Sequence, residues 1–308
     1  MKIVCSGDWH IRSTATKYRN PDYYDLMFGK IEWILQLAAK VGSLVILQPG
    51  DFFDTPDISN KTMIKVIQTI GETRVFTIYG QHDTKYRNID NTALTILAEA
   101  DVVELLNDEP VEYEENKQVD IYGASWETNI PKVDNKNHYN ILVLHRMITK
   151  GGPLFPDQTD YDDATKFAKS YNQFDLIVSG DNHQSFSYIA EHDHEATLIN
   201  CGSLMRMTTA QYKHKPCVWI ADTIKGTVEQ HFIPLKPAAE VFKPEAAEIK
   251  ERDEKMEAFI KTLTVSKDDS KLSFEDNLKK IMTSQKLGSN VTDLIDTFIT
   301  NHHTQGDK

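Results

Sequence analysis

Residues 1–10 read Met1-Lys2-Ile3-Val4-Cys5-Ser6-Gly7-Asp8-Trp9-His10, an apolar run of strand length that ends in a glycine, a carboxylate and an imidazole. Four more apolar runs along the chain are followed by residues of these types. Ser43–Gln48 leads into Gly50-Asp51, Arg74–Tyr79 into Gly80-Gln81-His82-Asp83, Asn140–Leu144 into His145, and Asp175–Ser179 into Gly180-Asp181-Asn182-His183. Short strands that alternate with longer helical patterns predict an α/β fold rather than a sandwich of hairpins.

Amphipathic segments lie between these strands. Apolar residues recur at helical spacing over Tyr23–Val41, Asn60–Ile70, Thr92–Ala100 and Asp162–Tyr171. Four extended segments then follow without a long helix, over Ser187–Ile189, Ala196–Asn200, Cys217–Asp222 and Thr227–Ile233. We expect the helices to cover the sheet of the first five strands, and the four later segments to form a second, largely antiparallel sheet.

The composition changes near residue 235, where Pro234, Pro237 and Pro244 fall close together. We therefore place a domain boundary there, between a domain of residues 1–235 and a helical C-terminal region of residues 236–308. Within that region the pattern predicts helices over Glu245–Thr262, Ser273–Gln285 and Val291–Thr300.

The overall composition limits the function. The 308 residues include 34 Lys and Arg against 46 Asp and Glu, a formal net charge of −12. This balance excludes a free-standing nucleic-acid binder with a broad basic face, although bound cations or a basic partner can offset it. Three cysteines without a close pair predict reduced, buried thiols. With neither a secretory signal nor an apolar run of about 18 residues, we expect a cytoplasmic protein with no membrane partner.

The polar residues that follow the five strands form a set of ligand type. Because strands of a parallel sheet end at one edge, we expect these side chains to converge there. The set is Asp8, His10, Asp51, Gln81, His145, Asp181 and His183. Apart from Gly80-Gln81-His82-Asp83, which has more polar residues than a turn requires, each motif alone fits an ordinary turn or strand end. The five together predict a site for two octahedral ions, with Mn²⁺, Mg²⁺ or Fe²⁺ favoured over structural zinc. Paired ions of this kind can activate water for attack on phosphorus.

In chain order, these motifs resemble the calcineurin-like metallophosphoesterase pattern D-x-H, G-D, G-N-H-[DE], H, G-H-x-H over residues 1–235. Within that superfamily the chain is most similar to SbcD-type DNA repair exonucleases of bacteria and phages. This likeness rests on Gly50-Asp51-Phe52-Phe53-Asp54, on Asn200-Cys201-Gly202-Ser203 and on the helical tail. The resemblance implies a four-layer sandwich of two β-sheets flanked by helices, followed by a small helical C-terminal region.

The resemblance also implies a role for each ligand-type residue. One ion falls to Asp8, His10, Asp51 and His183, and Asp51 bridges to a second ion held by Gln81, His145 and Asp181. His82 would protonate or stabilise the leaving oxygen, and Asp83 would hold the ring of His82. Manganese is the first choice for both ions.

Two of the predicted ligands depart from the family pattern. Gln81 stands where Asn is usual, and Asp181 stands where the first His of G-H-x-H is usual. Asp54 stands where family members often have a His that contacts the substrate phosphate. We therefore expect the second ion to bind differently or more weakly than the first.

The activity implied by the resemblance is hydrolysis of DNA phosphodiester bonds by a two-metal nuclease. Such a chain would be the catalytic subunit of an SbcC/SbcD-like complex, a homodimer bound through its C-terminal helices to an SbcC-like coiled-coil ATPase. Two other functions stay open from the residues themselves. One is a phosphodiesterase or phosphatase acting on nucleotides or phosphoproteins, and the other is a catalytically impaired scaffold or inhibitor.

Overall fold

The computed structural model describes residues 1–114, 118–154, 158–190 and 195–245. Met1–Pro244 form one compact unit. It extends past residue 235 because α5 (Ala238–Val241) packs back onto the domain, where Val241 and Phe242 are buried and the Lys243 amide donates to the Tyr18 carbonyl at 2.8 Å. The helices expected beyond this unit lie outside the described residues.

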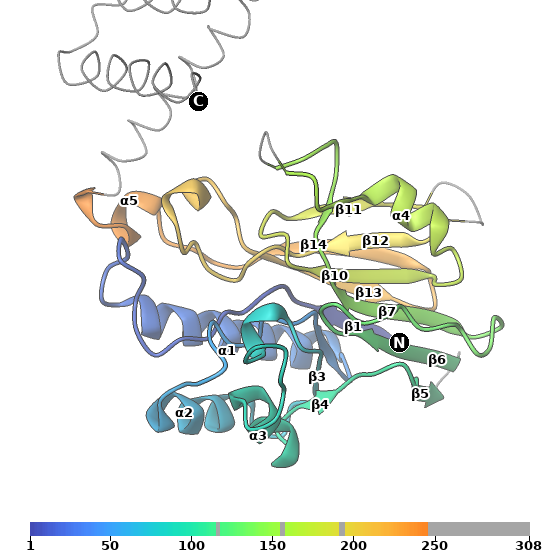
Figure 1. Ribbon diagram of the computed structural model, residues 1–308, viewed down its shortest axis with the longest axis horizontal. Helices are drawn as coiled ribbons and strands as arrows, with labels where there is room; N and C mark the ends of the chain where they lie inside the picture. The colour runs from blue at the N-terminus through green and yellow to red at the C-terminus, as the bar shows by residue number, and fades with distance from the viewer. Residues whose placement is uncertain (115–117, 155–157, 191–194, 246–308) are drawn as a thin grey trace, which may run out of the picture. The chain divides into compact units, whose positions relative to one another are not determined.

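Two six-stranded sheets form the centre of this unit (Figure 1). The first has the order β14-β13-β1-β2-β3-β4, parallel from β1 to β4, with β13 and β14 antiparallel at one edge. Its strands are β1 (Lys2–Cys5), β2 (Ile46–Gln48), β3 (Val75–Thr77), β4 (Glu104–Leu105), β13 (Cys217–Asp222) and β14 (Thr227–Phe232).

The second sheet has the order β11-β12-β10-β7-β6-β5, with four parallel strands in the middle and an antiparallel strand at each edge. Its strands are β5 (Val111–Glu114), β6 (Gln118–Ala124), β7 (Tyr139–His145), β10 (Leu176–Gly180), β11 (Phe186–Tyr188) and β12 (Thr197–Asn200). A short parallel pair, β8 (Ile148–Thr149) with β9 (Asp162–Asp163), forms a separate two-stranded sheet.

The expected division of strands between the sheets is wrong. The four late segments do not form a sheet of their own, since β11 and β12 extend one sheet while β13 and β14 extend the other. The five ligand-bearing strands are likewise divided, with β1, β2 and β3 in the first sheet and β7 and β10 in the second. A strand's alternation of apolar and polar residues predicts which face it buries, but it does not name the neighbour that completes its hydrogen bonds.

Alternating side chains along the strands build three apolar layers. Ile3 and Cys5 of β1 face the second sheet, whereas Val4 packs against the helices. In β7, Val143 belongs to the layer between the sheets, and Leu144 packs toward the helix on the outer face. The helices are α1 (Tyr23–Val41), α2 (Asn60–Ile70), α3 (Ala93–Glu99) and α4 (Ala164–Ser170). With α1, α2 and α3 on the first sheet and α4 on the second, the four-layer α/β sandwich is confirmed (Figure 1).

Local signals set the ends of the two longest helices, and both have the predicted bounds. Gly42 ends α1 in the left-handed conformation, with φ of 69°, and its amide donates to the carbonyl of Ala39. Ser59 caps α2, because its hydroxyl accepts a hydrogen bond from the Thr62 amide at 3.3 Å. The three cysteines are free and buried, as predicted. Across the described ranges, every helix is too short or too polar to cross a membrane.

Candidate metal centre

Three of the predicted ligands meet at the carboxyl ends of β1 and β10. Nε2 of His10 lies 3.0 Å from Nε2 of His183, and the latter nitrogen lies 3.7 Å from Oδ2 of Asp8. Two ligands at right angles, each about 2.1 Å from an octahedral ion, lie about 3.0 Å apart. Asp8, His10 and His183 therefore present their donor atoms at the spacing of ligands to a common ion.

We call Asp8, His10 and His183 the first half of the ligand set, and Gln81, His145 and Asp181 the second half. Asp51, which follows β2, lies between these two halves. Its Oδ2 is 3.6 Å from Nε2 of His10 and 3.4 Å from Nε2 of His145. Its Oδ1 accepts the backbone N–H of His82 at 2.9 Å, which fixes the orientation of the carboxylate. One oxygen of Asp51 thus faces an imidazole of each half, a position from which the carboxylate could bridge two ions.

The second half consists of His145, Gln81 and Asp181. Nδ1 of His145 donates to the carbonyl oxygen of Pro49 at 2.6 Å, so Nε2, which faces Asp51, is the nitrogen that could bind an ion. Gln81 and Asp181 contact each other, since Nε2 of Gln81 donates to Oδ1 of Asp181 at 2.8 Å. The two residues that depart from the family pattern are therefore direct partners.

Several buried polar atoms of this cluster have no hydrogen-bond partner among the described residues. They are Oδ1 of Asp8, Oδ2 of Asp51, Oε1 of Gln81 and Nε2 of His145. Buried polar atoms are almost always bonded, and all four atoms belong to predicted ligands. Hard oxygen and imidazole donors of this kind suit divalent cations such as Mn²⁺ or Mg²⁺. The residues present thus fit two divalent ions.

The backbone at the ligands is held in sparsely populated conformations. His10, Asp51 and Asp181 have φ of 44°, 48° and 79°, in the left-handed region that residues other than glycine rarely adopt. Such strain persists only where surrounding contacts enforce it, and it concentrates at functional sites. Close approach also requires glycine, since a Cβ atom on Gly80 would lie 2.2 Å from Oδ1 of Asp51.

Burial and mutual repulsion shape the ionisation of the cluster. Burial raises the pKa of Asp8 well above its usual range, and the nearby carboxylates of Asp51 and Asp181 raise it further against the opposing effect of His145. Burial alone would lower the pKa of His145, but the charge of Asp51 raises it to about 10. Burial and His10 lower the pKa of His183 to about 3, so its imidazole is neutral and able to bind a cation.

The structure corrects the expected partnership of His82 and Asp83. The carboxylate of Asp83 accepts the backbone N–H groups of Phe52, Phe53 and Gly80 at 2.9–3.1 Å, and it joins the loops after β2 and β3. The ring of His82 instead bonds through Nδ1 to the backbone carbonyl of Asp54 at 2.9 Å. Asp83 is next to His82 in the sequence, which made it the expected partner of the His82 ring. Three backbone N–H groups bind its carboxylate instead.

Two residues near the ligands have contacts that sequence reasoning did not assign to them. Asp54 lies 3.5 Å from Nδ1 of His10 and pairs with Arg12 at 3.1 Å, so it supports a ligand in addition to the His82 ring. Its position three residues after Asp51 was the available signal. Gln211 lies 3.3 Å from Nδ1 of His183 through its Nε2. No motif surrounds Gln211, and only the folded chain brings it to His183.

A cleft of about 440 Å³ opens beside the second half of the cluster. His145 and Asp181 form part of its wall, and Trp126, Arg146 and Tyr161 also line it. Arg146 pairs with Asp162 at 2.6 Å. The cleft thus places two aromatic side chains and a guanidinium next to predicted ligands of the second ion.

The chain is similar to one known protein family and to several solved structures. The family model described as calcineurin-like phosphoesterase matches residues 1–185. No curated protein matches the chain. Among solved structures, the chain is similar to TT1561 of Thermus thermophilus, with 10% identity and a TM-score of 0.47 over 76% of this chain and 99% of that one. It is also similar to a dimetal phosphatase from Danio rerio, with 11% identity and a TM-score of 0.43 over 72% and 92% of the two chains.

Proposed function

The chain belongs to the calcineurin-like phosphoesterase family, whose members hydrolyse phosphate esters with bound metal ions, and from that premise we propose that it is a DNA nuclease. In this proposal it cleaves phosphodiester bonds by a two-metal mechanism. It serves as the catalytic subunit of an SbcC/SbcD-like complex. Manganese is the proposed metal, because the donor set combines carboxylates, an amide and imidazoles.

The observation that carries the proposal is the position of Asp51. Its Oδ2 faces His10 on one side and His145 on the other, at 3.6 and 3.4 Å. Two divalent ions bound there would polarise a phosphoryl group and lower the pKa of a water molecule. Asp8, His10 and His183 would hold the first ion, whereas Gln81, His145 and Asp181 would hold the second.

The His82 side chain can serve the leaving group. It is exposed at the edge of the cluster, and its ring centroid lies 4.9 Å from that of His10. Because the Asp54 carbonyl accepts from Nδ1, the other nitrogen, Nε2, is left for the substrate. A protonated His82 would donate from Nε2 to the departing alkoxide, which general acid catalysis requires.

The cleft beside the second half supports a nucleotide-containing substrate. Trp126 and Tyr161 offer aromatic faces on which bases can stack, and Arg146 offers a cation to a phosphate. The net charge of −12 nevertheless gives the chain little basic surface for long DNA. We therefore propose an SbcC-like ATPase as the partner that supplies this surface, with a homodimer of the present chain in the complex.

A substrate comparison tests the proposal. The purified full chain is incubated with Mn²⁺ and, in parallel, with end-labelled DNA, a model phosphodiester and a model phosphomonoester. We expect release of labelled nucleotides or oligonucleotides from DNA and hydrolysis of the model diester.

Asp51→Asn is the control, because it keeps the size of the bridging side chain while removing its charge. This variant should lose both diester activities. Hydrolysis of the monoester alone would contradict the nuclease proposal and favour a phosphatase. DNA cleavage that persists in Asp51→Asn would contradict the proposed role of Asp51.

A further inference from the structure

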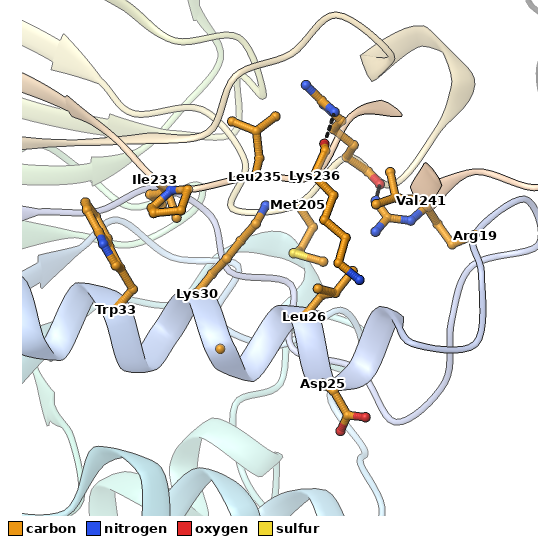
Figure 2. A pocket seen from close by; sticks show the side chains of 13 residues that line it. Arg19, Asp25, Leu26, Lys30, Trp33, Met205, Ile233, Leu235, Lys236 and Val241 are labelled. Carbon is orange, nitrogen blue, oxygen red and sulfur yellow. Dashed lines mark hydrogen bonds between the residues drawn. The ribbon is translucent and has the colours of Figure 1, made fainter. Parts of the chain in front are cut away.

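A second cavity lies away from the metal centre, between α1 and two segments of the chain, one that follows β12 and one that follows β14 (Figure 2). Its volume is about 340 Å³, within the usual range of small-molecule sites. Residues of α1 form one wall, and the chain at 205–206 and 233–241 forms the other. None of the described residues that line it is a predicted metal ligand.

One part of the cavity is apolar. Leu26 and Trp33 of α1 are partly buried, and Met205, Ile233 and Val241 opposite them are almost fully buried. Figure 2 shows Trp33 at one end of the cavity, beside Ile233, and Met205 near the ammonium group of Lys30. An aromatic or aliphatic body could therefore lie along this wall and remove apolar surface from water.

The lining of the cavity is also strongly cationic. Arg19, Lys30, Arg206 and Lys236 line it, against one carboxylate, that of Asp25, among its described lining residues. Asp25 is exposed, and its carboxylate points away from the cavity, below α1 (Figure 2). Lys236 pairs with Asp22 at 3.0 Å. In a chain of net charge −12, this is an unusual local excess of positive charge.

The two arginines are buried without a carboxylate partner in the described part of the chain. Arg19 is 3% exposed and Arg206 is 7% exposed. The hydrogen bonds of Arg206 go to the backbone carbonyls of His214 and Lys236, at 2.6 and 3.2 Å. Arg19 donates to the carbonyl of Arg206, whereas its Nε has no partner among the described residues. Carbonyl oxygens satisfy donors but do not neutralise charge, and an uncompensated buried charge is costly.

Lys30 occupies the centre of this arrangement. Its ammonium group donates to the carbonyl of Leu204 at 2.8 Å, which is the hydrogen bond that the described structure gives to this three-donor group. Burial, with Arg19 and Arg206 nearby, lowers the pKa of Lys30 to about 7. An anion in the cavity would relieve this repulsion and bond to the remaining N–H donors.

We propose that this cavity binds a small organic anion that has an apolar body. The carboxylate or phosphate head lies against Lys30 and the guanidinium of Arg206, and the apolar body lies against Trp33, Leu26 and Met205. This site is distinct from the metal centre and takes no part in the phosphoester chemistry.

A fluorescence titration tests the proposal with anilinonaphthalene sulfonate, an aromatic sulfonate that combines both chemical features. The full chain should bind one equivalent of the probe, with quenching of tryptophan emission from Trp33. Octanoate and octyl phosphate should displace it, and their relative affinities distinguish a carboxylate head from a phosphate head. Octanol, which has the same body without charge, should displace it on the order of 10-fold less well, because a hydrogen bond to a charged group is lost.

Lys30→Met is the decisive variant, because it keeps the length of the side chain but removes its charge. We expect its affinity for the probe to fall roughly 10-fold or more. Lys40→Met is the matched control, since Lys40 is an exposed residue of the same helix and does not line the cavity. Its affinity should equal that of the parent. An unchanged affinity in Lys30→Met, or no binding by the full chain, would overturn the proposal.

A second measurement needs no variant. Acetic anhydride acetylates neutral amines, and mass spectrometry reports the modification of each lysine. Octanoate or octyl phosphate at saturating concentration should slow the acetylation of Lys30 several-fold and leave that of Lys40 unchanged. Equal acetylation of Lys30 with and without these anions would also overturn the proposal.

Discussion

The two halves of the metal centre differ in what their donor atoms contact. In the first half, Nε2 of His10 and Nε2 of His183 face each other at 3.0 Å, beside the carboxylate of Asp8. In the second half, Gln81 donates to Asp181 at 2.8 Å. In the first half, the donor atoms already face a common position for an ion. In the second half, an ion must displace the Gln81 amide before it can bind this oxygen of Asp181.

This difference explains how the chain accommodates its two departures from the family pattern. The extra methylene of Gln81 lets its amide reach Asp181, and an aspartate at 181 gives that amide an acceptor. Oε1 of Gln81 stays buried without a partner among the described residues, so it is still available to an ion. We infer a strong first site and a weaker second site, joined by Asp51. Four predictions test this contrast, from the largest expected effect to the smallest.

Asp51→Asn should abolish activity, because this residue is shared by both halves. Loss of a residue that only supports a metal ligand typically costs about 10- to 100-fold, so loss of a shared ligand costs more. Hydrolysis of a model phosphodiester by purified protein in Mn²⁺ measures the effect. If Asp51→Asn kept a tenth of the parent activity or more, the two halves would not share this carboxylate.

His82→Gln should lower kcat by about 10²- to 10⁴-fold, since general acid catalysis contributes that much. The number and affinity of bound ions should not change, because the backbone N–H of His82, not its ring, contacts Asp51. Steady-state kinetics and calorimetric titration with Mn²⁺ measure the two quantities. The kcat of His82→Gln should fall less on a substrate with a good leaving group, such as a nitrophenyl ester that releases nitrophenolate, than on DNA. Loss of an ion in His82→Gln would show that this ring is a ligand.

Asp181→Asn should lower the affinity for the second ion by about 10- to 100-fold and leave the affinity for the first ion almost unchanged. Asparagine still accepts the hydrogen bond of Gln81, so the variant removes charge without breaking the local structure. Calorimetric titration with Mn²⁺ should resolve two events in the parent and a selective loss of the weaker one here. His183→Asn is the matched variant in the first half, and it should lower the affinity of the tighter binding event. If both variants lowered the affinity of the same binding event, the two halves would not be separate sites of different strength.

The stability of the metal-free protein should depend on His145. Burial lowers its pKa, but the charge of Asp51 outweighs this and raises it from 6.5 to about 10. The folded state therefore holds this proton more tightly than the unfolded state does. The resulting stability is fully present below pH 6.5 and is lost as the pH rises through about 10.

Urea unfolding in EDTA measures this dependence. Between these two pH values the free energy of unfolding should fall with rising pH, by at most about 1.4 kcal/mol per pH unit for one group. His145→Gln should flatten the dependence, since glutamine does not titrate. A parent protein with the same pH dependence as His145→Gln would show that His145 is not protonated beside Asp51.

The sequence predicted the elements whose signals are local. Helices α1 and α2 have strong apolar periodicity and clear terminal residues at Gly42 and Ser59, and their bounds are as predicted. The ligands after β1, β2 and β3 follow apolar runs directly, so their convergence could be predicted from strand direction alone. These features need only neighbours in the chain.

Features that depend on distant partners could not be predicted in the same way. The late strands joined two different sheets because each completes the hydrogen bonds of a strand far away in sequence, such as β13 with β1. The carboxylate of Asp83 accepts hydrogen bonds from three backbone N–H groups and not from the adjacent His82 ring. The cationic cavity is assembled from segments as distant as Arg19 and Lys236. Charge patterns along the chain carry no sign of that assembly.

Anomalous X-ray diffraction from crystals grown with Mn²⁺ tests the central claim most directly. The account predicts two peaks about 3.5–4 Å apart, both within bonding distance of the Asp51 carboxylate. One peak should contact His10 and His183 at high occupancy, and the other should contact His145 at lower occupancy. No peak beside Asp51, or a single peak that contacts none of His10, His183 and His145, would contradict the two-metal site and the nuclease function proposed from it.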